Sequence, residues 1–304
     1  MTPEPHPSIQ PAKLLARRGL LKGASALTAG LLVGGCGGRK SDGSLLSELQ
    51  EGGSIKVGFA NEAPYVFKTD QGKLTGQSVE VAREILHRLG IDEMQGVLTD
   101  FKSLIPGLKS GNYDMVTAGM GITPERCQEV LFSDPDYCAP QTFLVKRGNP
   151  LGLSDYDSVV RNSKAKIAVL QGGIALQQVK AAGVPSAQLT PLPSPQNMLA
   201  ALQAGRVNAV TLTTLSARHL LQSTSSDKFE TTPPFTVTVD GEEQPSCGGY
   251  VFRTEDQKFR DKFNVTLNTM QEKHKILPIV KKFGFTKIEI GAARGHSAKE
   301  LCAD

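Results

Sequence analysis

Strand and helix patterns alternate between residues 54 and 118, and this alternation constrains the fold more than any other feature of the chain. Ser54–Phe59 alternates apolar and polar residues as a half-buried strand does. Apolar residues then recur at helical spacing from Ser78 to Leu89, and Gly90 follows as a helix stop. Further segments continue the alternation: a strand at 97–99, a helix at 103–110 and a strand at 115–118. This order predicts an α/β fold with an open, mainly parallel sheet and a site where loops leave the carboxyl ends of its strands.

A second set of strands and helices follows Cys138, so we expect two lobes. Its strands are expected at 142–146, 166–170 and 209–212, and its helices at 174–181 and 196–204. Cys247–Arg253 is typical of a returning strand, and a helix at 256–274 and a tail at 276–285 come after it. The first lobe is then 54–138 plus 254–304 and the second is 139–253. The chain passes between them twice, and such paired crossings form a hinge.

The N-terminal segment has the pattern of an export signal. Ala16–Lys22, with the sequence ARRGLLK, matches the twin-arginine pattern, and a short apolar stretch follows it. Val33–Cys36, with the sequence VGGC, matches a lipoprotein processing site whose cysteine becomes the lipidated N-terminus. We therefore expect residues 1–35 to be removed, Cys36 to be lipidated and 36–53 to be a linker. The protein would be exported and anchored to the outer face of the cytoplasmic membrane.

Charge and composition argue against a nucleic-acid partner. The whole chain carries a formal charge of +4, and residues 1–35 contribute four basic residues and one acidic residue, so the remainder carries +1. Aromatic residues are only 6% of the chain, and no stripe of Lys and Arg is visible. About 269 residues remain without the signal, a length that suits two lobes better than one core.

Apart from Cys36, the chain has an even number of cysteines, which in an exported protein indicates disulfides. They are Cys127, Cys138, Cys247 and Cys302. Three pairings are open. We favour Cys138 with Cys247, because both lie where the chain should cross between lobes, which leaves Cys127 with Cys302. No C-x-x-C pair and no histidine at ligand spacing accompanies them, so we expect neither a metal site nor a cofactor.

The segment Gly111–Cys138 contains the clearest candidate for a binding residue. After a short strand and a glycine-flanked loop comes Thr123-Pro124-Glu125-Arg126, in which Thr before Pro signals a helix start. Arg126 should therefore lie in a first helical turn. A guanidinium beside the free N–H groups of a helix start is well arranged to hold a carboxylate by two bonds.

The order of the motifs resembles that of the extracellular solute-binding proteins of polar amino-acid-type ABC importers, family 3. The resemblance runs from about Ser54 to Cys302. It is carried by four segments: GFANEAPY at 58–65, 111–137, LQAGRVNA at 202–209 and CGGYVFR at 247–253. It implies a two-lobed periplasmic-binding-protein-like fold with a two-crossing hinge and a ligand cleft between the lobes. It also implies a monomer whose partners are a small ligand and an ABC permease with its ATPase.

Within that family the chain is most similar to the ectoine- and hydroxyectoine-binding subgroup, and the similarity implies a ligand constellation. Glu62 would face the cationic part of the ligand, Tyr65 and Phe101 would contact that cation through their ring faces, and Arg126 would hold a carboxylate. Topology alone places Glu62, Phe101 and the loop from Gly119 to Gly121 at one rim, because each follows a strand of the first sheet.

The chain also departs from its relatives at ligand positions. Gly121 stands where the ectoine-binding subgroup has a third aromatic residue, a change expected to weaken selectivity for a flat cation, to enlarge the pocket, or both. Amino-acid-binding members open a second-lobe helix with Gly-Thr, whereas this chain has Gly172, Gly173 and Ile174, whose glycines could offer backbone N–H groups. Thr213 replaces the aspartate that binds an α-ammonium, and this argues against an ordinary α-amino acid.

We therefore expect a binding lipoprotein for a small zwitterion of the ectoine type, and not an enzyme. A receptor for polar or modified amino acids is the first alternative. The second is an enzyme similar to cyclohexadienyl dehydratases on the same fold, for which Glu62 is the one ready proton-transfer residue. A sensory role, in which the closed receptor contacts a signalling ectodomain, would use the same features.

Overall fold

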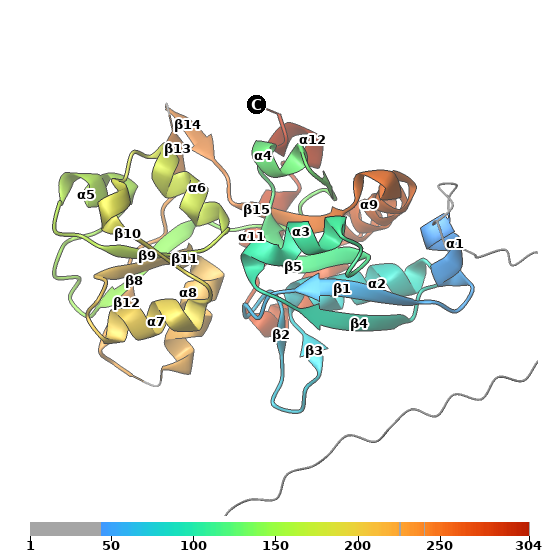
Figure 1. The fold of residues 1–304 in the computed structure, drawn as a ribbon, viewed down its shortest axis with the longest axis horizontal. Helices are drawn as coiled ribbons and strands as arrows, with labels where there is room; N and C mark the ends of the chain where they lie inside the picture. The colour runs from blue at the N-terminus through green and yellow to red at the C-terminus, as the bar shows by residue number, and fades with distance from the viewer. Residues whose placement is uncertain (1–43, 225, 240, 304) are drawn as a thin grey trace, which may run out of the picture. The chain divides into compact units, whose positions relative to one another are not determined.

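The computed structural model describes residues 44–224, 226–239 and 241–303 (Figure 1), all of which belong to one compact unit of the chain. The expected export signal, the lipidated Cys36 and the linker residues 37–43 lie outside the described residues. Within them, no helix combines the length and apolar character that crossing a membrane requires. The described linker residues begin with helix α1 (Ser44–Gln50), and Leu45 and Leu49 on this helix are buried.

A six-stranded mixed sheet forms the centre of what we call the first lobe. Its strands, in spatial order, are β4 (Glu93–Leu98), β1 (Ser54–Phe59), β5 (Met115–Gly121), β15 (Cys247–Phe252) and β6 (Leu131–Phe132), with β7 (Tyr137–Cys138) also paired to β15. β1 is parallel to β4 and β5, as the alternation of strands and helices predicts, but β15 is antiparallel to its neighbours. The strand β5 also continues through Gly121, so the glycine-flanked loop expected there is part of a strand.

A five-stranded sheet forms the centre of the second lobe. Its strands, in spatial order, are β10 (Leu189–Leu192), β9 (Ile167–Leu170), β11 (Ala209–Thr213), β8 (Gln141–Lys146) and β12 (Phe229–Thr231). Two small hairpins complete the strands: β2 (Phe67–Lys68) with β3 (Leu74–Thr75), and β13 (Val237–Val239) with β14 (Glu242–Gln244).

One boundary between the lobes differs from the expected one. We expected Cys247–Arg253 to close the second lobe, but β15 pairs with strands of the first sheet, so the second lobe ends before Cys247. The expectation was wrong because an apolar strand pattern does not reveal which sheet the strand will join. We propose that the lobes otherwise divide as expected, and the C-terminal helices agree with this because they contact β6 and β7.

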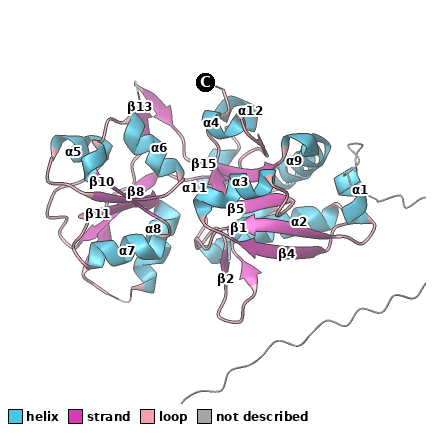
Figure 2. Cartoon of the chain, in the orientation of Figure 1, coloured by secondary structure: helices cyan, strands magenta, loops and turns pink. Residues whose placement is uncertain are grey.

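Helices flank both sheets (Figure 2). Those of the first lobe are α2 (Gln77–Arg88), α3 (Leu104–Lys109), α4 (Pro124–Cys127), α9 (Gln257–Glu272), α10 (Ile276–Val280), α11 (Lys287–Ala293) and α12 (Ala298–Leu301). Those of the second lobe are α5 (Tyr156–Arg161), α6 (Ile174–Ala181), α7 (Pro195–Gln203) and α8 (Thr214–Ser223). Their buried residues lie on one face, as in Val81, Ala82 and Ile85 of α2. Burial of such faces is the main source of helix stability in a protein.

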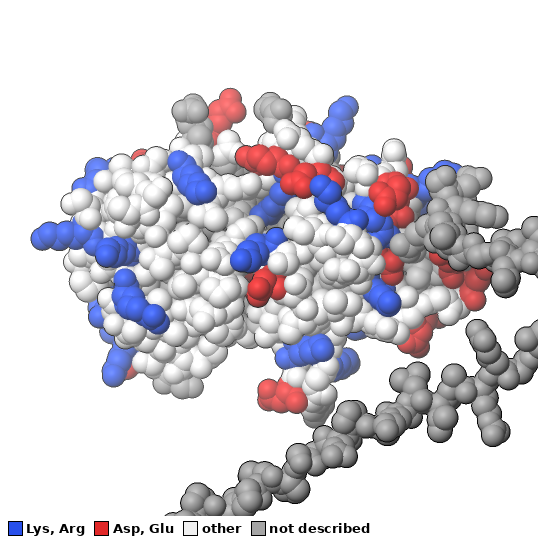
Figure 3. All heavy atoms as spheres, viewed as in Figure 1, with Lys and Arg blue, Asp and Glu red and all other residues white. Residues whose placement is uncertain are grey.

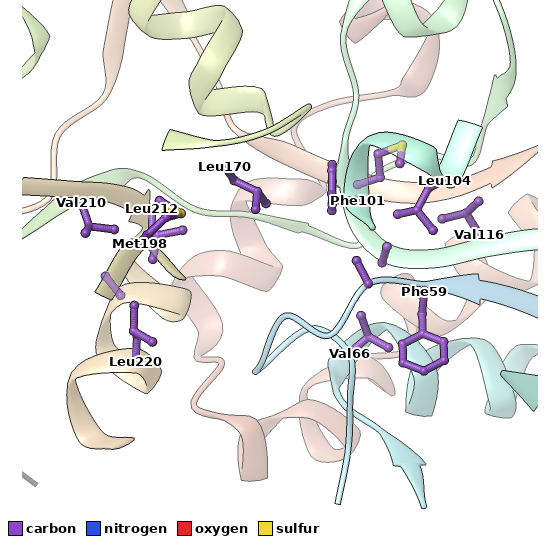
Figure 4. Packing of buried hydrophobic residues seen from close by; sticks show 14 of the residues in the cluster. Phe59, Val66, Phe101, Leu104, Val116, Leu170, Met198, Val210, Leu212 and Leu220 are labelled. Atoms are coloured by element: carbon purple, nitrogen blue, oxygen red, sulfur yellow. The ribbon is translucent and has the colours of Figure 1, made fainter. Parts of the chain in front are cut away.

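A continuous cluster of buried apolar residues extends from one lobe to the other (Figure 4). Phe59 and Val116 belong to its first-lobe side, and Val210 and Leu212 to its second-lobe side. Phe101 and Leu170 lie between the two groups in this view. The lobes are therefore in apolar contact, next to the cavity described below.

The chain passes between the two sheets at two adjacent places. Ala139 follows β7 and its N–H donates to the carbonyl of Ser246, which precedes β15, at 3.0 Å. Cys138 and Cys247 are register partners in the β7–β15 pair and form a disulfide. The second disulfide joins Cys127 to Cys302 across 175 residues. Both favoured pairings are thereby confirmed.

Charged side chains are spread over the face shown in Figure 3, with basic residues scattered singly on the second lobe and both signs close together on the first. A few ionisable groups are instead buried, among them Glu62, Arg126 and Asp136. Asp136 accepts hydrogen bonds from Gln77 Nε2 at 2.5 Å and from the Tyr250 hydroxyl at 2.7 Å, and burial raises its pKa to about 7.

Candidate ligand-binding site

A cavity lies between the lobes and draws its walls from both of them. It encloses about 490 Å³ of empty space, part of which is open to solvent. The lining residues are Glu62, Tyr65, Phe101, Gly119, Gly121, Tyr137, Gln141, Leu170, Gly173, Ile174, Ala175, Thr211, Leu212, Thr213 and Ser246. All the ligand positions expected from the sequence are in this set except Arg126 and Gly172. A second hollow shares Glu62, Phe101 and Leu170 with the cavity and continues toward the surface between β4 and α7.

Glu62 and Tyr65 reach the cavity from the segment that follows β1. The backbone there turns back on itself, because the Glu62 N–H and the Val66 N–H each donate to the other residue's carbonyl. The Tyr65 hydroxyl lies 2.8 Å from Thr213 Oγ1, and the Ser216 hydroxyl donates to Glu62 Oε1 at 2.9 Å. Thr213 and Ser216 belong to the start of α8, so both contacts join the first lobe to the second.

Glu62 is the one acidic residue among those that line the cavity in the described part of the chain. Its side chain is only 8% exposed, and burial raises its pKa to about 7, although the hydrogen bond from Ser216 opposes that shift. Desolvation disfavours the ionised carboxylate, so a cation placed beside Glu62 would restore it. The Glu62 carboxylate is thus a suitable partner for a cationic group of a ligand.

Arg126 is positioned by α4, as the helix-start motif predicts. Thr123 Oγ1 accepts a hydrogen bond from the Arg126 N–H, Pro124 occupies the first turn, and the Arg126 side chain is 8% exposed. Its Nη1 donates to the carbonyl of Gly121 and its Nη2 to that of Gly172, the latter at 2.5 Å. Burial lowers its pKa to about 10, so the guanidinium stays charged at neutral pH.

Arg126 therefore lies against the cavity wall and not in its lining. Gly121 is a lining residue and Gly172 precedes another, so both of its backbone acceptors belong to the rim. The guanidinium carbon also lies 5.9 Å from the centre of the Phe101 ring. A ligand carboxylate would offer a charged, two-oxygen acceptor in place of these neutral carbonyls, and charge-assisted bonds of that kind are about twice as strong.

Aromatic rings form one side of the cavity. The ring of Tyr65 lies 4.6 Å from that of Tyr137, and Phe285 meets both edge-on at 5.7 and 5.9 Å. Burial holds the pKa of Tyr65 and of Tyr137 well above the ordinary value, so both phenols remain neutral. Gly119 permits this arrangement, because it has a φ of +57° and a Cβ there would lie 2.8 Å from the Tyr65 ring.

The absence of a side chain at Gly121 was expected to enlarge the pocket, but a side chain from the second lobe occupies that space. A Cβ built on Gly121 would lie 2.9 Å from Ile174 Cδ1 and 3.0 Å from Ile174 Cβ. The side chain of Ile174, at the start of α6, therefore fills the space that a residue at 121 would need. An apolar wall from the second lobe replaces one from the first.

Gly172 and Gly173 lie where the backbones of the two lobes approach each other closely. Gly172 has a φ of +74°, and a Cβ there would lie 3.0 Å from Lys102 Cα, so a larger residue would push the lobes apart. The Gly173 N–H donates to the Leu170 carbonyl at 3.0 Å and is thus already engaged within the turn. Gly173 contributes backbone to the cavity wall rather than a free donor.

Several lining residues were not expected from the sequence. Tyr137 is the last residue of the segment 111–137 that carries the family resemblance, so its place in that segment was a usable signal. Gln141 and Ser246 lie at the two crossings between the sheets, and only the folded chain brings them together. Ser216 donates to Glu62 without lining the cavity, and it was not expected either. Its N–H donates to Thr213 Oγ1, which caps α8, so its place three residues after Thr213 was a local signal.

One group of metal-ligand type occurs among the described residues, namely Cys138, Cys247 and His296. Its two sulfur atoms are joined in a disulfide. Because the thiolate is the form of cysteine that binds a metal, this group is not a metal centre in the oxidised protein.

Comparisons with known proteins agree with this geometry. The model of the bacterial extracellular solute-binding proteins, family 3, matches residues 55–287. A probable amino-acid ABC transporter periplasmic-binding protein, y4tE of Sinorhizobium fredii, is 34% identical over 262 residues, which cover 85% of this chain and 86% of that protein.

Solved structures with the same fold include EhuB in complex with hydroxyectoine, with a TM-score of 0.78 and 35% identity over 86% of this chain and 99% of that one. The ancestral amino-acid-binding protein AncCDT-1, a precursor of cyclohexadienyl dehydratase, has a TM-score of 0.68 and 25% identity over 79% of this chain and 99% of that one. The chain thus belongs to the bacterial extracellular solute-binding proteins, family 3, and is a solute-binding protein of an amino-acid-type ABC importer.

Proposed function

We propose that the protein captures a small zwitterion, a compatible solute of the ectoine or hydroxyectoine type, and delivers it to an ABC permease. The observation that carries this proposal is that two buried groups of opposite charge type meet at one cavity, since Glu62 lines it and Arg126 donates to its lining residue Gly121. A cyclic cation beside Glu62 would face the rings of Tyr65 and Phe101, and its carboxylate would face Arg126. Cation–π contacts of this kind contribute on the order of 0.5–2 kcal/mol each.

An ordinary α-amino acid fits the cavity less well. A primary ammonium concentrates its charge and loses more hydration on burial than a delocalised cation does. Thr213 supplies only a hydroxyl, and that hydroxyl lies 2.8 Å from the Tyr65 hydroxyl. Glu62 is then the one anion among the described residues that line the cavity, which favours a cation whose charge is spread over a ring. A polar or modified amino acid remains the alternative ligand.

Ligand capture would be coupled to closure of the lobes. The bonds from Tyr65 to Thr213, from Ser216 to Glu62 and from Arg126 to Gly172 all join one lobe to the other. A ligand that binds Glu62 and Arg126 together would contact two of the residues that form these bonds between the lobes. It would therefore stabilise the closed arrangement of the lobes. The permease would then recognise the outer faces that closure brings into position.

We also propose that the protein is exported and held at the membrane by a lipid on Cys36. The twin-arginine and lipoprotein patterns of residues 1–36 support this. The family model, which describes extracellular proteins, supports export independently. A Cys36→Ser variant should be released from the membrane fraction in fractionated cells, whereas the native chain should stay with it.

The ligand is tested by thermal unfolding and calorimetric titration of residues 37–304 with ectoine, hydroxyectoine, betaines, proline and polar amino acids. A ligand at a hundred times its Kd adds about 2.7 kcal/mol to the free energy of unfolding, which shifts the melting temperature measurably. We expect the ectoines to give the largest shift. No binding of either ectoine at millimolar concentration would overturn this ligand, and binding of none of the panel would overturn the proposed zwitterion class.

Catalysis is the second candidate, because Glu62 has a pKa of about 7, which suits proton transfer at neutral pH. The similarity to a precursor of cyclohexadienyl dehydratase gives this candidate a definite substrate class. Incubation with prephenate and arogenate should show no turnover if the protein only binds. Product formation that is lost in Glu62→Gln would establish an enzyme instead.

A further inference from the structure

One wall of the cavity is formed by the two segments that cross between the lobes. Gln141 is the first residue of β8, and Ser246 directly precedes β15. Both line the cavity, and both crossings are held in place by backbone bonds, from Ala139 to Ser246 and between Gln141 and Phe235. The side chains on this wall are therefore fixed by the hinge and do not depend on a flexible loop.

The polar groups of this wall are hydrogen-bonded to one another, but the set is incomplete. Gln141 Nε2 donates to Ser246 Oγ at 2.9 Å, and Gln178 Nε2 donates to the same oxygen at 3.0 Å. Gln141 is only 1% exposed, yet its Oε1 has no hydrogen-bond partner among the described residues. A buried amide oxygen without a partner is uncommon, because leaving it so costs about as much as a lost hydrogen bond.

Exchanging the positions of the Gln141 amide oxygen and nitrogen does not give every polar group of this wall a hydrogen-bond partner. Gln178 Nε2 also reaches the carbonyl of Gln244 at 3.3 Å, so the Gln178 amide is oriented with its nitrogen toward these acceptors. If Ser246 instead donated its proton to Gln141 Oε1, the NH₂ of Gln141 would be the group left over. In either orientation the Gln141 amide has one polar group that no described residue satisfies.

We propose that Gln141 binds a hydroxyl group of the ligand. A hydroxyl both donates and accepts, so it satisfies the amide in either orientation, and it adds no charge to a wall whose other polar members, Ser246 and Thr211, are also neutral. The ligand would then carry a carboxylate for Arg126, a cation for Glu62 and a hydroxyl for Gln141. This inference rests on the proposed function and narrows it to hydroxylated zwitterions, with hydroxyectoine preferred over ectoine.

The test compares matched ligands that differ by one hydroxyl. Calorimetric titration of residues 37–304 with hydroxyectoine and ectoine, and with 4-hydroxyproline and proline, should give at least one pair in which the hydroxylated member binds about tenfold more tightly or better. Gln141→Leu removes the amide at similar size and should reduce that ratio to within about threefold. Far-UV circular dichroism and thermal melting show whether this variant is folded.

Gln177 offers a matched control. It is the same residue type, its Oε1 also has no partner among the described residues, and it does not line the cavity. Gln177→Leu should keep the hydroxyl preference of the wild type. Equal binding of both members of every pair that binds would overturn this inference alone, and so would a preference that survives Gln141→Leu. Failure of every ligand to bind would overturn the proposed zwitterion ligand together with the inference.

The wild-type ratio needs no variant, so the inference stays testable even if Gln141→Leu does not fold. In that case Ser246→Ala provides the second variant, because it removes the partner that orients the Gln141 amide. It should weaken the hydroxyl preference without abolishing it. An unchanged ratio in a folded Ser246→Ala would show that the hydroxyl is bound elsewhere.

Discussion

Gly121 and Ile174 compete for one space although they belong to different lobes. A Cβ on Gly121 would lie 2.9 Å from Ile174 Cδ1, so the absence of a side chain at one position permits the presence of a branched side chain at the other. The pair explains why the missing third aromatic residue does not leave a hole. It also places an apolar wall of the cavity on the second lobe, whereas Arg126 belongs to the first.

Gly121→Ala should destabilise the closed protein by about 1–3 kcal/mol, because the added methyl group meets Ile174 Cβ as well as the flexible Cδ1. Ile174→Ala in the same chain should relieve most of that cost. Thermal unfolding and ligand titration of the two single variants and the double variant measure the coupling. Additive effects would show that the two side chains do not share the space.

Arg126→Lys should weaken zwitterion binding about a hundredfold, because an ammonium cannot offer two parallel donors to a carboxylate. Titration measures the loss, and thermal melting confirms that the variant is folded. Arg88→Lys is the control and should leave affinity unchanged, since Arg88 pairs with Glu84 on an exposed helix face and neither residue lines the cavity. Native affinity in Arg126→Lys would remove Arg126 from the site.

Ligand affinity should fall as the pH drops below 7, by up to about tenfold per pH unit, because a cationic ligand needs the ionised form of Glu62. The raised pKa of about 7 means that Glu62 is protonated in the empty protein at pH 5 and ionised at pH 8. Tyr65 and Tyr137 stay neutral and Arg126 stays charged through this range, so none of them masks the effect.

The raised pKa of Glu62 makes the free energy of unfolding depend on pH in the opposite direction to ligand affinity. The raised pKa of Glu62 stabilises the ligand-free protein most below the ordinary pKa of 4.5, and that contribution is lost as the pH rises through about 7. Ligand titration of the wild type and of Glu62→Gln between pH 5 and pH 8 measures the effect on binding. Thermal unfolding over the same range measures the effect on folding. The variant should bind weakly with a flat profile, and a flat wild-type profile would contradict the role of Glu62.

Thr213→Asp should extend binding toward α-amino acids. It places a carboxylate beside the Tyr65 hydroxyl, at the position where the resemblance predicts an ammonium partner. Affinity for glutamine or arginine should rise about tenfold or more, since hydrogen bonds to charged groups are the stronger ones. Thr213→Asn has similar size and no charge, and it should gain nothing. An equal gain in both variants would show that shape and not charge selects the ligand.

Replacing Cys127 and Cys302 by serine should lower the free energy of unfolding by about 2–5 kcal/mol. Ligand affinity should fall as well, because Cys127 is the neighbour of Arg126 in α4. Thermal melting of the oxidised wild type, the reduced wild type and the variant makes the comparison. Identical melting temperatures of the oxidised wild type and the variant would show that the bridge does not stabilise the native protein.

The sequence predicted the elements whose signals are local. The helix expected at Ile174–Ala181 has those bounds in the structure, and Thr123 starts α4 as its motif indicates. The helices α5 and α8 were not expected, although Asp155 and Thr213 cap them, because their short apolar patterns do not differ from those of loops. The sheet to which β15 belongs is a matter of long-range pairing, which a single strand pattern does not encode.

The residues of the site also divide into those with a local sequence signal and those brought together only by long-range contacts. Glu62, Phe101 and Gly121 could be collected from the sequence because each lies at or just beyond the end of a first-sheet strand, where the chain reaches one rim. Gln141 and Ser246 are 105 residues apart and meet only because the two crossings run side by side. The contact between Gly121 and Ile174 depends on how the lobes meet, which no local pattern reports.

Phe285 gives the last part of the chain a role in assembly of the site. Its ring lies edge-on against Tyr65 and Tyr137, and Cys302 ties the following residues to the helix of Arg126. A nascent chain that has left the ribosome only as far as the second lobe therefore lacks the support of its aromatic wall. We therefore expect a chain that stops before Phe285 to bind ligand more weakly than one that includes it.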